Sequence, residues 1–141
     1  MSGVTVIRYL LAHDSPVLAV AAADNIAAGD LPLRATLPGI AVAQVSSVPR
    51  LTVSMGDRMQ HTDRVQVSVL VKGTDASPAG TGYPGVKRLL KLVLAACPNK
   101  HGSVNGIDVD FILPDSEGPD FHDSELALHS GSRDFIVRWN E

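Results

Sequence analysis

The sequence is poor in aromatic side chains and in cysteine, and it has no excess of positive charge. Aromatic residues make up 4% of its 141 residues, so few side chains could stack on nucleic-acid bases. The single cysteine, Cys97, cannot form an internal disulfide framework. A net charge of −3 offers no general basic surface, which a protein that neutralises phosphates needs. These deficits argue against direct, sequence-specific binding of nucleic acid.

Long apolar runs are lacking as well. No stretch of about 18 residues is apolar enough to cross a bilayer, and residues 1–8 lack the basic segment and apolar run of a signal peptide. We therefore expect no membrane partner and a location in the cytoplasm. The hydrophobic fraction of 45% and the charged fraction of 19% are ordinary for a folded protein. The length predicts a single domain over residues 1–141.

The first third of the chain predicts two short helices. Ile7, Leu10 and Leu11 stand at helical spacing and indicate a helix over about residues 4–12. Ser15 can cap a second helix, running to about residue 22, because Pro16 suits the first helical position, where an N–H group has no partner. Residues 25–26 then indicate a short strand.

The middle of the chain predicts two strands and a helix. Residues 39–47 alternate with a period of two. Residues 64–72 set four valines on one face against polar groups on the other, a pattern typical of an antiparallel sheet with one covered face. Residues 49–62 form a polar link between these strands, and residues 84–96 place apolar side chains at the spacing of an amphipathic helix.

The last third predicts three strands, at residues 107–113, 125–129 and 135–139. Turn-forming residues separate them at 115–119 and 130–132. The resulting order is α-α-β-β-α-β-β-β. It predicts an α+β fold in which helices pack on one face of an antiparallel sheet.

A glycine motif precedes the predicted helix. Gly80, Gly82 and Gly85 match the G-x-G-x-x-G pattern of a dinucleotide-binding turn, which lies between a strand and a helix. The predicted strand ends well before the motif, at Lys72, and Pro84 removes an N–H group where phosphate-facing donors are needed. The neighbouring strands are also predicted to be antiparallel. A flexible loop over residues 73–85 explains the motif better, and a small nucleotide-binding enzyme is kept as an alternative.

The remaining polar residues form no recognisable catalytic or metal-binding set. The five histidines show neither H-E-x-x-H spacing nor a nearby cysteine pair, so surface histidines explain them better. Cys97 follows an apolar helical face and is expected to pack as a small hydrophobic residue. The acidic residues between 115 and 123 lack the ligand spacing of an EF-hand. We therefore predict a non-enzymatic protein that uses no cofactor and no metal.

The polar link at residues 49–62 has the composition of a contact surface. It combines methionine with arginine, and both residue types are enriched at protein interfaces. An ordinary solvated hairpin loop explains this composition equally well. The candidate interface residues are Arg50, Met55, Asp57, Arg58, Met59 and His61.

Several segments, taken in order, resemble the tail-completion family of long-tailed phages, whose members act as tail terminators. Residues 10–17, LLAHDSPV, are similar to the family's "LL-A-x-D" entry into a helix of small residues. Asn25-Ile26 followed by residues 37–46, LPGIAVAQVS, resembles its "R-I … L-P-x-I-V-Y-Q-x-V-S" passage.

The second half of the chain continues the resemblance. Residues 64–69, RVQVSV, are similar to the family's "R-V-Q-V-D-V" strand, and the helix ending at residues 92–96 follows in the expected order. Residues 133–139, RDFIVRW, resemble its closing "x-D-F-x-V-x-W/Y" strand. The family differs at residues 23–25, where it commonly has a glycine turn and arginine, and at Ala43, where it has an aromatic residue. The resemblance covers essentially the whole chain, and the order and spacing of the motifs carry it.

The resemblance implies a structural subunit of a homo-oligomeric, six-fold ring. Such a ring would cap the last ring of the tail-tube protein, stop polymerisation at the length set by the tape-measure protein, and offer a docking surface to a head-completion or connector protein. The protein would act in the host cytoplasm during assembly and then in the virion. A head–tail connector of the neck in the same kind of virion is the alternative. No catalytic residue is implied.

Overall fold

A computed structural model describes residues 2–29, 38–51, 58–73 and 82–141. Its helices are α1 (Gly3–Ala12), α2 (Ser15–Leu18), the 3-10 helix η1 (Ala23–Asn25) and α3 (Gly82–Ala96). Its strands are β1 (Ile26–Ala28), β2 (Gly39–Leu51), β3 (Met59–Lys72), β4 (Gly102–Val104), β5 (Ile107–Glu117), β6 (Phe121–Asp123) and β7 (Leu128–Asn140). The predicted α+β class is confirmed.

The strands form one seven-stranded sheet in the order β1-β2-β3-β7-β5-β4, with β6 beside β7. β2, β3, β7 and β5 pair antiparallel, as predicted. β1, however, pairs parallel to β2, with Ile26 opposite Ile40. The sheet is therefore mixed rather than purely antiparallel. β1 has only three residues, too few for the alternation that would announce a strand and its direction.

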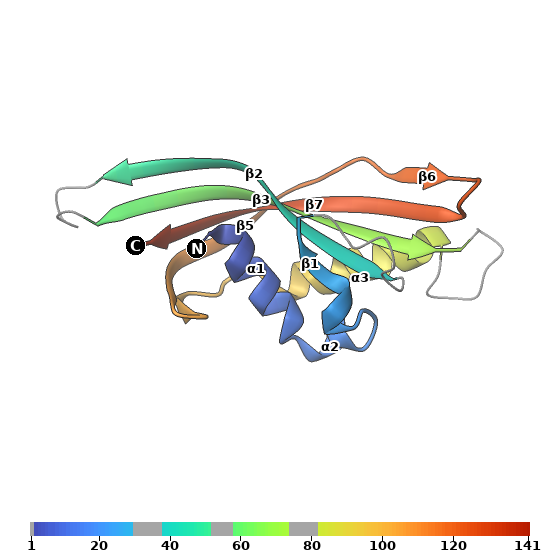
Figure 1. The fold of residues 1–141 in the computed structure, drawn as a ribbon, viewed down its shortest axis with the longest axis horizontal. Coiled ribbons are helices and arrows are strands. Elements are labelled where there is room, and N and C mark those ends of the chain that lie inside the picture. Colours follow the sequence, from blue (N-terminus) through green and yellow to red (C-terminus); the bar gives the residue numbers. More distant parts are fainter. Residues whose placement is uncertain (1, 30–37, 52–57, 74–81) are drawn as a thin grey trace.

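The helices lie on one side of the sheet and bury its aliphatic face (Figure 1). The valines of β3 at positions 65, 67, 69 and 71 all point to this side and are buried. Phe135 and Val137 of β7 extend the same layer, and Leu89 and Val93 of α3 pack into it. Burial of this aliphatic surface is the main driving force for folding of the subunit.

Side-chain caps fix where the first two helices begin. Ser2 caps α1 because its hydroxyl accepts a hydrogen bond from Thr5 N at 3.4 Å. Asp14, not Ser15, caps α2, because its Oδ2 accepts from Val17 N at 3.2 Å. α2 ends at Leu18, earlier than the sequence predicts.

Two predicted links turn out to be strand. Pro49, Arg50 and Leu51 belong to β2, and residues 59–62 belong to β3, so residues 49–62 are not a loop throughout. Residues 130–132 are not a turn either, because β7 runs through them without interruption. Gly131 explains the error: a Cβ there would lie 2.9 Å from Val86 Cγ1, so glycine lets α3 approach the sheet closely instead of making a turn.

The strands near the C-terminal hairpin also differ from the prediction. β5 continues through Glu117, where a turn beginning at residue 115 is predicted. The strand preceding the last turn is β6, at residues 121–123, whereas the predicted strand at 125–129 falls mostly in that turn. Asp123 holds the turn by accepting from the main-chain N–H groups of Glu125 and Leu126. A turn held by side-chain hydrogen bonds to the main chain has no hydrophobic alternation that the sequence could reveal. Across the described ranges, no helix has the length and apolarity needed to cross a membrane.

Candidate functional site

The ends of β2 and β3 that lie farthest from α3 project beyond the helices (Figure 1). We define the arm as residues 45–51 of β2 together with Arg58 and residues 59–64 of β3. Every arm residue of β2 is exposed, including Val45, Val48 and Leu51, whose side chains are 54–62% exposed. The β3 half of the arm lies between β2 and β7 and is largely covered. The open surface of the arm is therefore the outer side of β2.

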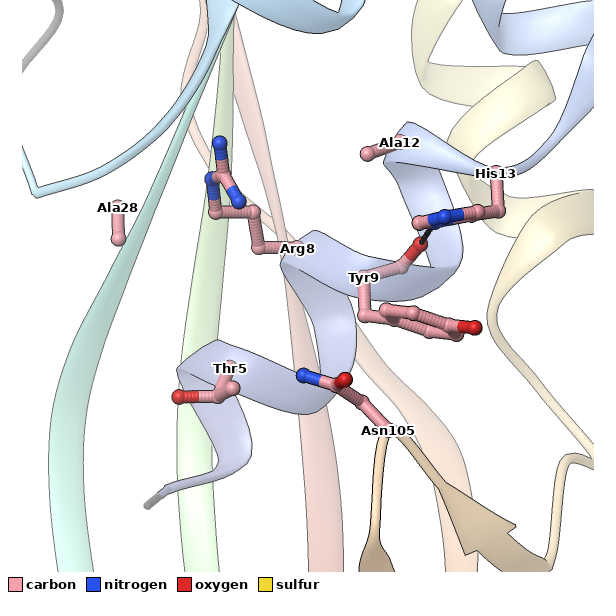
Figure 2. A pocket seen from close by; sticks show the side chains of 7 residues that line it. All are labelled: Thr5, Arg8, Tyr9, Ala12, His13, Ala28 and Asn105. Atoms are coloured by element: carbon pink, nitrogen blue, oxygen red, sulfur yellow. Dashed lines mark hydrogen bonds between the residues drawn. The ribbon is translucent and has the colours of Figure 1, made fainter.

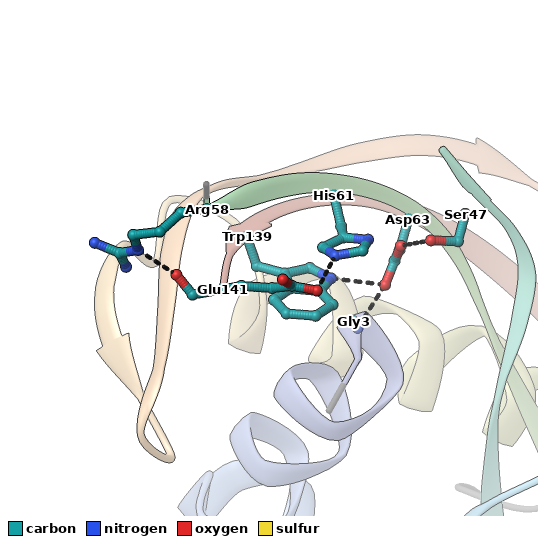
Figure 3. A network of polar contacts seen from close by, with 7 residues as sticks. All are labelled: Gly3, Ser47, Arg58, His61, Asp63, Trp139 and Glu141. Atoms are coloured by element: carbon teal, nitrogen blue, oxygen red, sulfur yellow. Dashed lines mark hydrogen bonds and ion pairs between the residues drawn. The ribbon is translucent and has the colours of Figure 1, made fainter. Parts of the chain in front are cut away.

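A buried carboxylate fixes the base of the arm to the body of the protein (Figure 3). Asp63 is 1% exposed. Its Oδ2 accepts from the main-chain N–H of Gly3 at 2.7 Å and from Trp139 Nε1 at 2.8 Å, and its Oδ1 accepts from the Ser47 hydroxyl. These bonds join β3 to α1, β7 and β2 at one point. A carboxylate with several donors is the arrangement that makes a buried charge tolerable.

Close packing supports the same junction. A Cβ on Gly3 would lie 2.9 Å from Asp63 Cβ, so only glycine lets the start of α1 reach the carboxylate. The His61 ring stacks on Trp139 with centroids 4.3 Å apart, and His61 Nε2 lies 2.8 Å from Glu141 Oε1. Arg58 Nε donates to the main-chain oxygen of Glu141. The β3 half of the arm is thus fastened to the end of β7.

The structure separates the residues predicted as an interface loop into three groups. Arg50 lies on the open edge in β2, opposite Gln60 of β3. Arg58, Met59 and His61 lie at the start of β3, where the last two are half-buried. Met55 and Asp57 lie outside the described residues. Sequence reasoning missed Asp63, Ser47 and Trp139, although Asp63 continues the odd-numbered positions of the buried valine face.

The sheet face opposite the helices is polar. On it, Arg64 Nη1 lies 2.6 Å from Asp115 Oδ2 and 3.7 Å from Asp134 Oδ2. Arg138 lies over the Phe111 ring at 4.9 Å, and its Nε donates to the Thr62 hydroxyl. The two carboxylates thus neutralise the charge of Arg64, and Arg138 contacts neutral groups. These interactions suit a hydrated surface or a polar contact, and they provide no reactive group.

A pocket of about 330 Å³ lies on the outer side of α1, next to β1 and the turn between β4 and β5 (Figure 2). Tyr9 and His13 stack at 4.1 Å on one wall, and His13 Nδ1 lies 2.8 Å from the Tyr9 main-chain oxygen. Arg8 donates through Nε to the Ile26 main-chain oxygen at 3.0 Å. The remaining lining residues are Thr5, Ala12, Ala28 and Asn105. Of these two polar contacts, one lies within α1 and the other joins α1 to β1.

Three ionisable groups are perturbed for structural reasons. Burial raises the pKa of the Cys97 thiol to about 12, as expected of a cysteine packed in the core. The hydrogen bond from Lys87 Nζ to Asp120 lowers the pKa of that carboxyl and raises the pKa of Lys87. Tyr83 also donates to Asp120, at 3.2 Å. Together these contacts link the start of α3 to the segment before β6.

The histidines and the glycine motif differ in part from their predicted positions. His129 is buried, contrary to the prediction of surface histidines, and it stacks on His122 across the β6–β7 pair at 4.2 Å. Within the described ranges, no group of three or more His, Cys, Asp or Glu residues could hold a metal ion. Gly82 and Gly85 belong to α3 rather than to a loop, while Gly80 lies outside the described residues. The strand before α3, β3, has antiparallel neighbours on both sides, unlike the strand of a dinucleotide-binding turn.

Comparison with known proteins identifies a similar fold but no family. Neither a protein-family model nor a curated protein sequence matches this chain. A chain in the solved structure of the virion of a native gene transfer agent (GTA) particle has a similar structure, with a TM-score of 0.66 at 14% sequence identity. The match covers 99% of this chain and 96% of that chain. The two proteins therefore share a fold over their whole lengths.

Proposed function

We propose that this chain is a structural virion protein that caps a tail tube as an oligomeric ring. The ring ends tube polymerisation and provides the surface to which the head docks. The observation that carries this proposal is the full-length fold shared with a chain of the GTA virion. The ordered resemblance to the tail-completion family supports the more specific role of tail terminator.

The arrangement of the site suits an assembly role. The arm carries three exposed apolar side chains, and a buried carboxylate joins its base to the body. A surface used for binding is more precise when it is built on a braced element. The perturbed groups Cys97, Lys87 and Asp120 have structural causes and are not gathered around a cleft. These features favour contact over catalysis.

Electron microscopy tests the proposal directly. Purified protein is imaged alone and after mixing with tail tubes assembled from the major tube protein encoded beside it. We expect rings with a central hole in the first sample, in the second, or in both, and capped tube ends in the second. Free monomers alone in both samples would contradict a ring-forming cap.

A head–tail connector of the neck is the second candidate, because the same shared fold supports any structural role in a virion. The two roles differ in what the protein binds first. A terminator binds the end of a tail tube in the absence of heads, whereas a connector binds filled heads in the absence of tails. Sedimentation with each particle separately distinguishes them.

A further inference from the structure

The sheet has two open edges. One is the outer side of β2 from Ala43 to Leu51, because β1 pairs only with residues 40–42. The other is formed by β5 and β6, which follow each other along the same side of β7: Glu117 lies opposite Arg133, and Phe121 lies opposite Ser130. Asn99 N donates to Ile112 O at 3.3 Å. From residue 113 to residue 123, no described strand pairs with the outer side of this second edge.

Exposed apolar side chains are concentrated on these two edges. In the described part of the chain, eight large hydrophobic side chains are exposed, and only two of them, Leu18 and Tyr83, lie on helices. The other six divide equally between the edges. They are Val45, Val48 and Leu51 on the β2 edge, and Leu113, Phe121 and Leu126 on or beside the β5–β6 edge, where they are 47–64% exposed.

The two edges differ in charge. The only ionisable side chain of β2 is Arg50, so this edge carries one positive charge and no negative one. Residues 110–127 contain no lysine or arginine and six acidic residues: Asp110, Asp115, Glu117, Asp120, Asp123 and Glu125. Arg64 and Lys87 neutralise part of this charge. The β5–β6 edge therefore stays acidic, and the arm edge is basic.

We propose that the open β2 edge of one subunit packs against the β5–β6 edge of the next copy, and that this contact closes the ring. The inference rests on the proposed function because it names the contact within that ring. An edge that met its own counterpart would bring like charges together, whereas β2 against β5–β6 joins basic to acidic and apolar to apolar. Contact between two different surfaces of the same chain is the head-to-tail geometry that generates rings.

A proline lies on each of the two edges. Pro49 lies in β2 and Pro114 lies in β5, and proline is tolerated in edge strands because its missing N–H can face away from the ladder. Each proline removes a main-chain donor from an otherwise continuous edge. Side chains must then provide much of the recognition, which protects the edges from indiscriminate strand pairing.

Two variants, each blocked on one edge, test the pairing. The arm variant carries Val48→Asp and Leu51→Asp, and the edge variant carries Phe121→Asp and Leu126→Asp. We expect each variant alone to remain monomeric, because each lacks one half of every contact. Mixed together, they should form a one-to-one heterodimer through the intact β2 edge of one and the intact β5–β6 edge of the other. Native mass spectrometry separates this heterodimer from either homodimer by mass.

The control is Leu18→Asp, which places the same charge on an exposed leucine of α2 away from both edges. It should assemble like the wild type. Circular dichroism and thermal unfolding verify that every variant is folded. If an aspartate pair prevents folding, Val48→Ser with Leu51→Ser and Phe121→Ser with Leu126→Ser replace it.

The outcomes separate this inference from the proposed function. A heterodimer that appears only in the mixture supports the pairing. If the wild type forms rings but the mixture yields no heterodimer, the pairing is overturned and the ring is not. The same holds if the wild type forms rings and one variant still assembles alone. A wild-type protein that forms no ring, either alone or on tail tubes, overturns both.

Discussion

The part of the sheet beneath the helices and the arm that projects beyond them are built from the same strands on different principles. Beneath the helices, β3 alternates buried valines with half-buried side chains, so its buried face is entirely aliphatic there. In the arm, β2 buries none of its side chains, and one carboxylate, Asp63, joins it to the body. The covered part buries its apolar side chains within the protein, whereas the arm leaves apolar side chains exposed.

We infer from this difference that the covered part stabilises the chain and that the arm takes part in the proposed assembly. Exposed valine and leucine side chains add little to the stability of a monomer, and exposed apolar surface is a feature of interaction sites. Substitutions beneath the helices should therefore reduce stability, and substitutions on the arm edge should reduce assembly.

The largest effect is expected in the covered part. Phe135→Ala removes a fully buried ring and leaves a cavity, so it should lower the free energy of unfolding by about 3–5 kcal/mol. The matched control is Ile136→Ala, because the neighbouring side chain points to the uncovered face and is only half-buried. Urea denaturation measures both. Equal losses for the two variants would contradict the two-sided description of the sheet.

The junction between the two parts should be the next most sensitive point. Asp63→Ala leaves the Trp139 Nε1–H and Gly3 N–H groups buried without their acceptor, at a cost of about 1–3 kcal/mol. Asp115→Ala removes a partly exposed ion pair with Arg64 and should cost less than about 1 kcal/mol. Chemical denaturation compares the two variants. A larger loss for Asp115 would show that the buried carboxylate does not hold the arm.

The covered part should also weaken at alkaline pH through Cys97. The pKa of this thiol is raised from its ordinary value of 9.0 to about 12, because burial disfavours the thiolate. The unfolded thiol therefore ionises first, and its contribution to stability is lost as the pH rises from 9 towards 12. Unfolding free energies of the wild type and Cys97→Ala, measured across this range, should diverge. Parallel curves would show that the thiol is not buried.

A smaller, acid-dependent effect is expected where α3 meets the segment before β6. The hydrogen bond from Lys87 holds the pKa of Asp120 below its ordinary value of 3.8. The stabilisation is present above 3.8 and is lost as the pH falls through the lower value of the folded state. Because the carboxyl is exposed, the effect should be slight. Asp120→Asn should abolish this part of the pH dependence, as measured by thermal unfolding between neutral and acid pH.

The smallest effect on stability is expected at the arm edge. Val48→Ser combined with Leu51→Ser replaces two exposed side chains and should change the free energy of unfolding by no more than about 0.5 kcal/mol per site. Denaturation of the double variant beside the wild type tests this. A loss comparable to that of Phe135→Ala would mean that the arm belongs to the core of the subunit.

Sequence patterns predicted the covered part well and the arm poorly, for a physical reason. The valines of residues 64–72 and the apolar face of residues 84–96 alternate because each segment has one buried side, and both elements were confirmed. Residues 45–51 of β2 are all exposed, so no buried side imposes a period on them, and Pro49 suggests a break. Strands whose pairing depends on their neighbours rather than on burial leave no periodic signal.

Two further errors arise from residues with uncommon uses. Gly131 suggests a turn, yet it serves the close contact between α3 and β7. Asp63 was missed, and it occupies a buried-face position where three donors surround its carboxylate. Its place in the odd-numbered series with Val65 and Val67 was the available clue. The parallel strand β1 was indicated only by residues 25–26, and nothing in them specified its direction.

The most direct test of the account compares the wild type with Val48→Ser/Leu51→Ser in negative-stain images, taken at equal concentration and, in a second series, with tail tubes present. We expect rings and capped tubes for the wild type, and isolated subunits and bare tube ends for the variant. The free energy of unfolding should be the same for both. Rings of equal abundance in the two samples would contradict the claim that the arm exists for assembly.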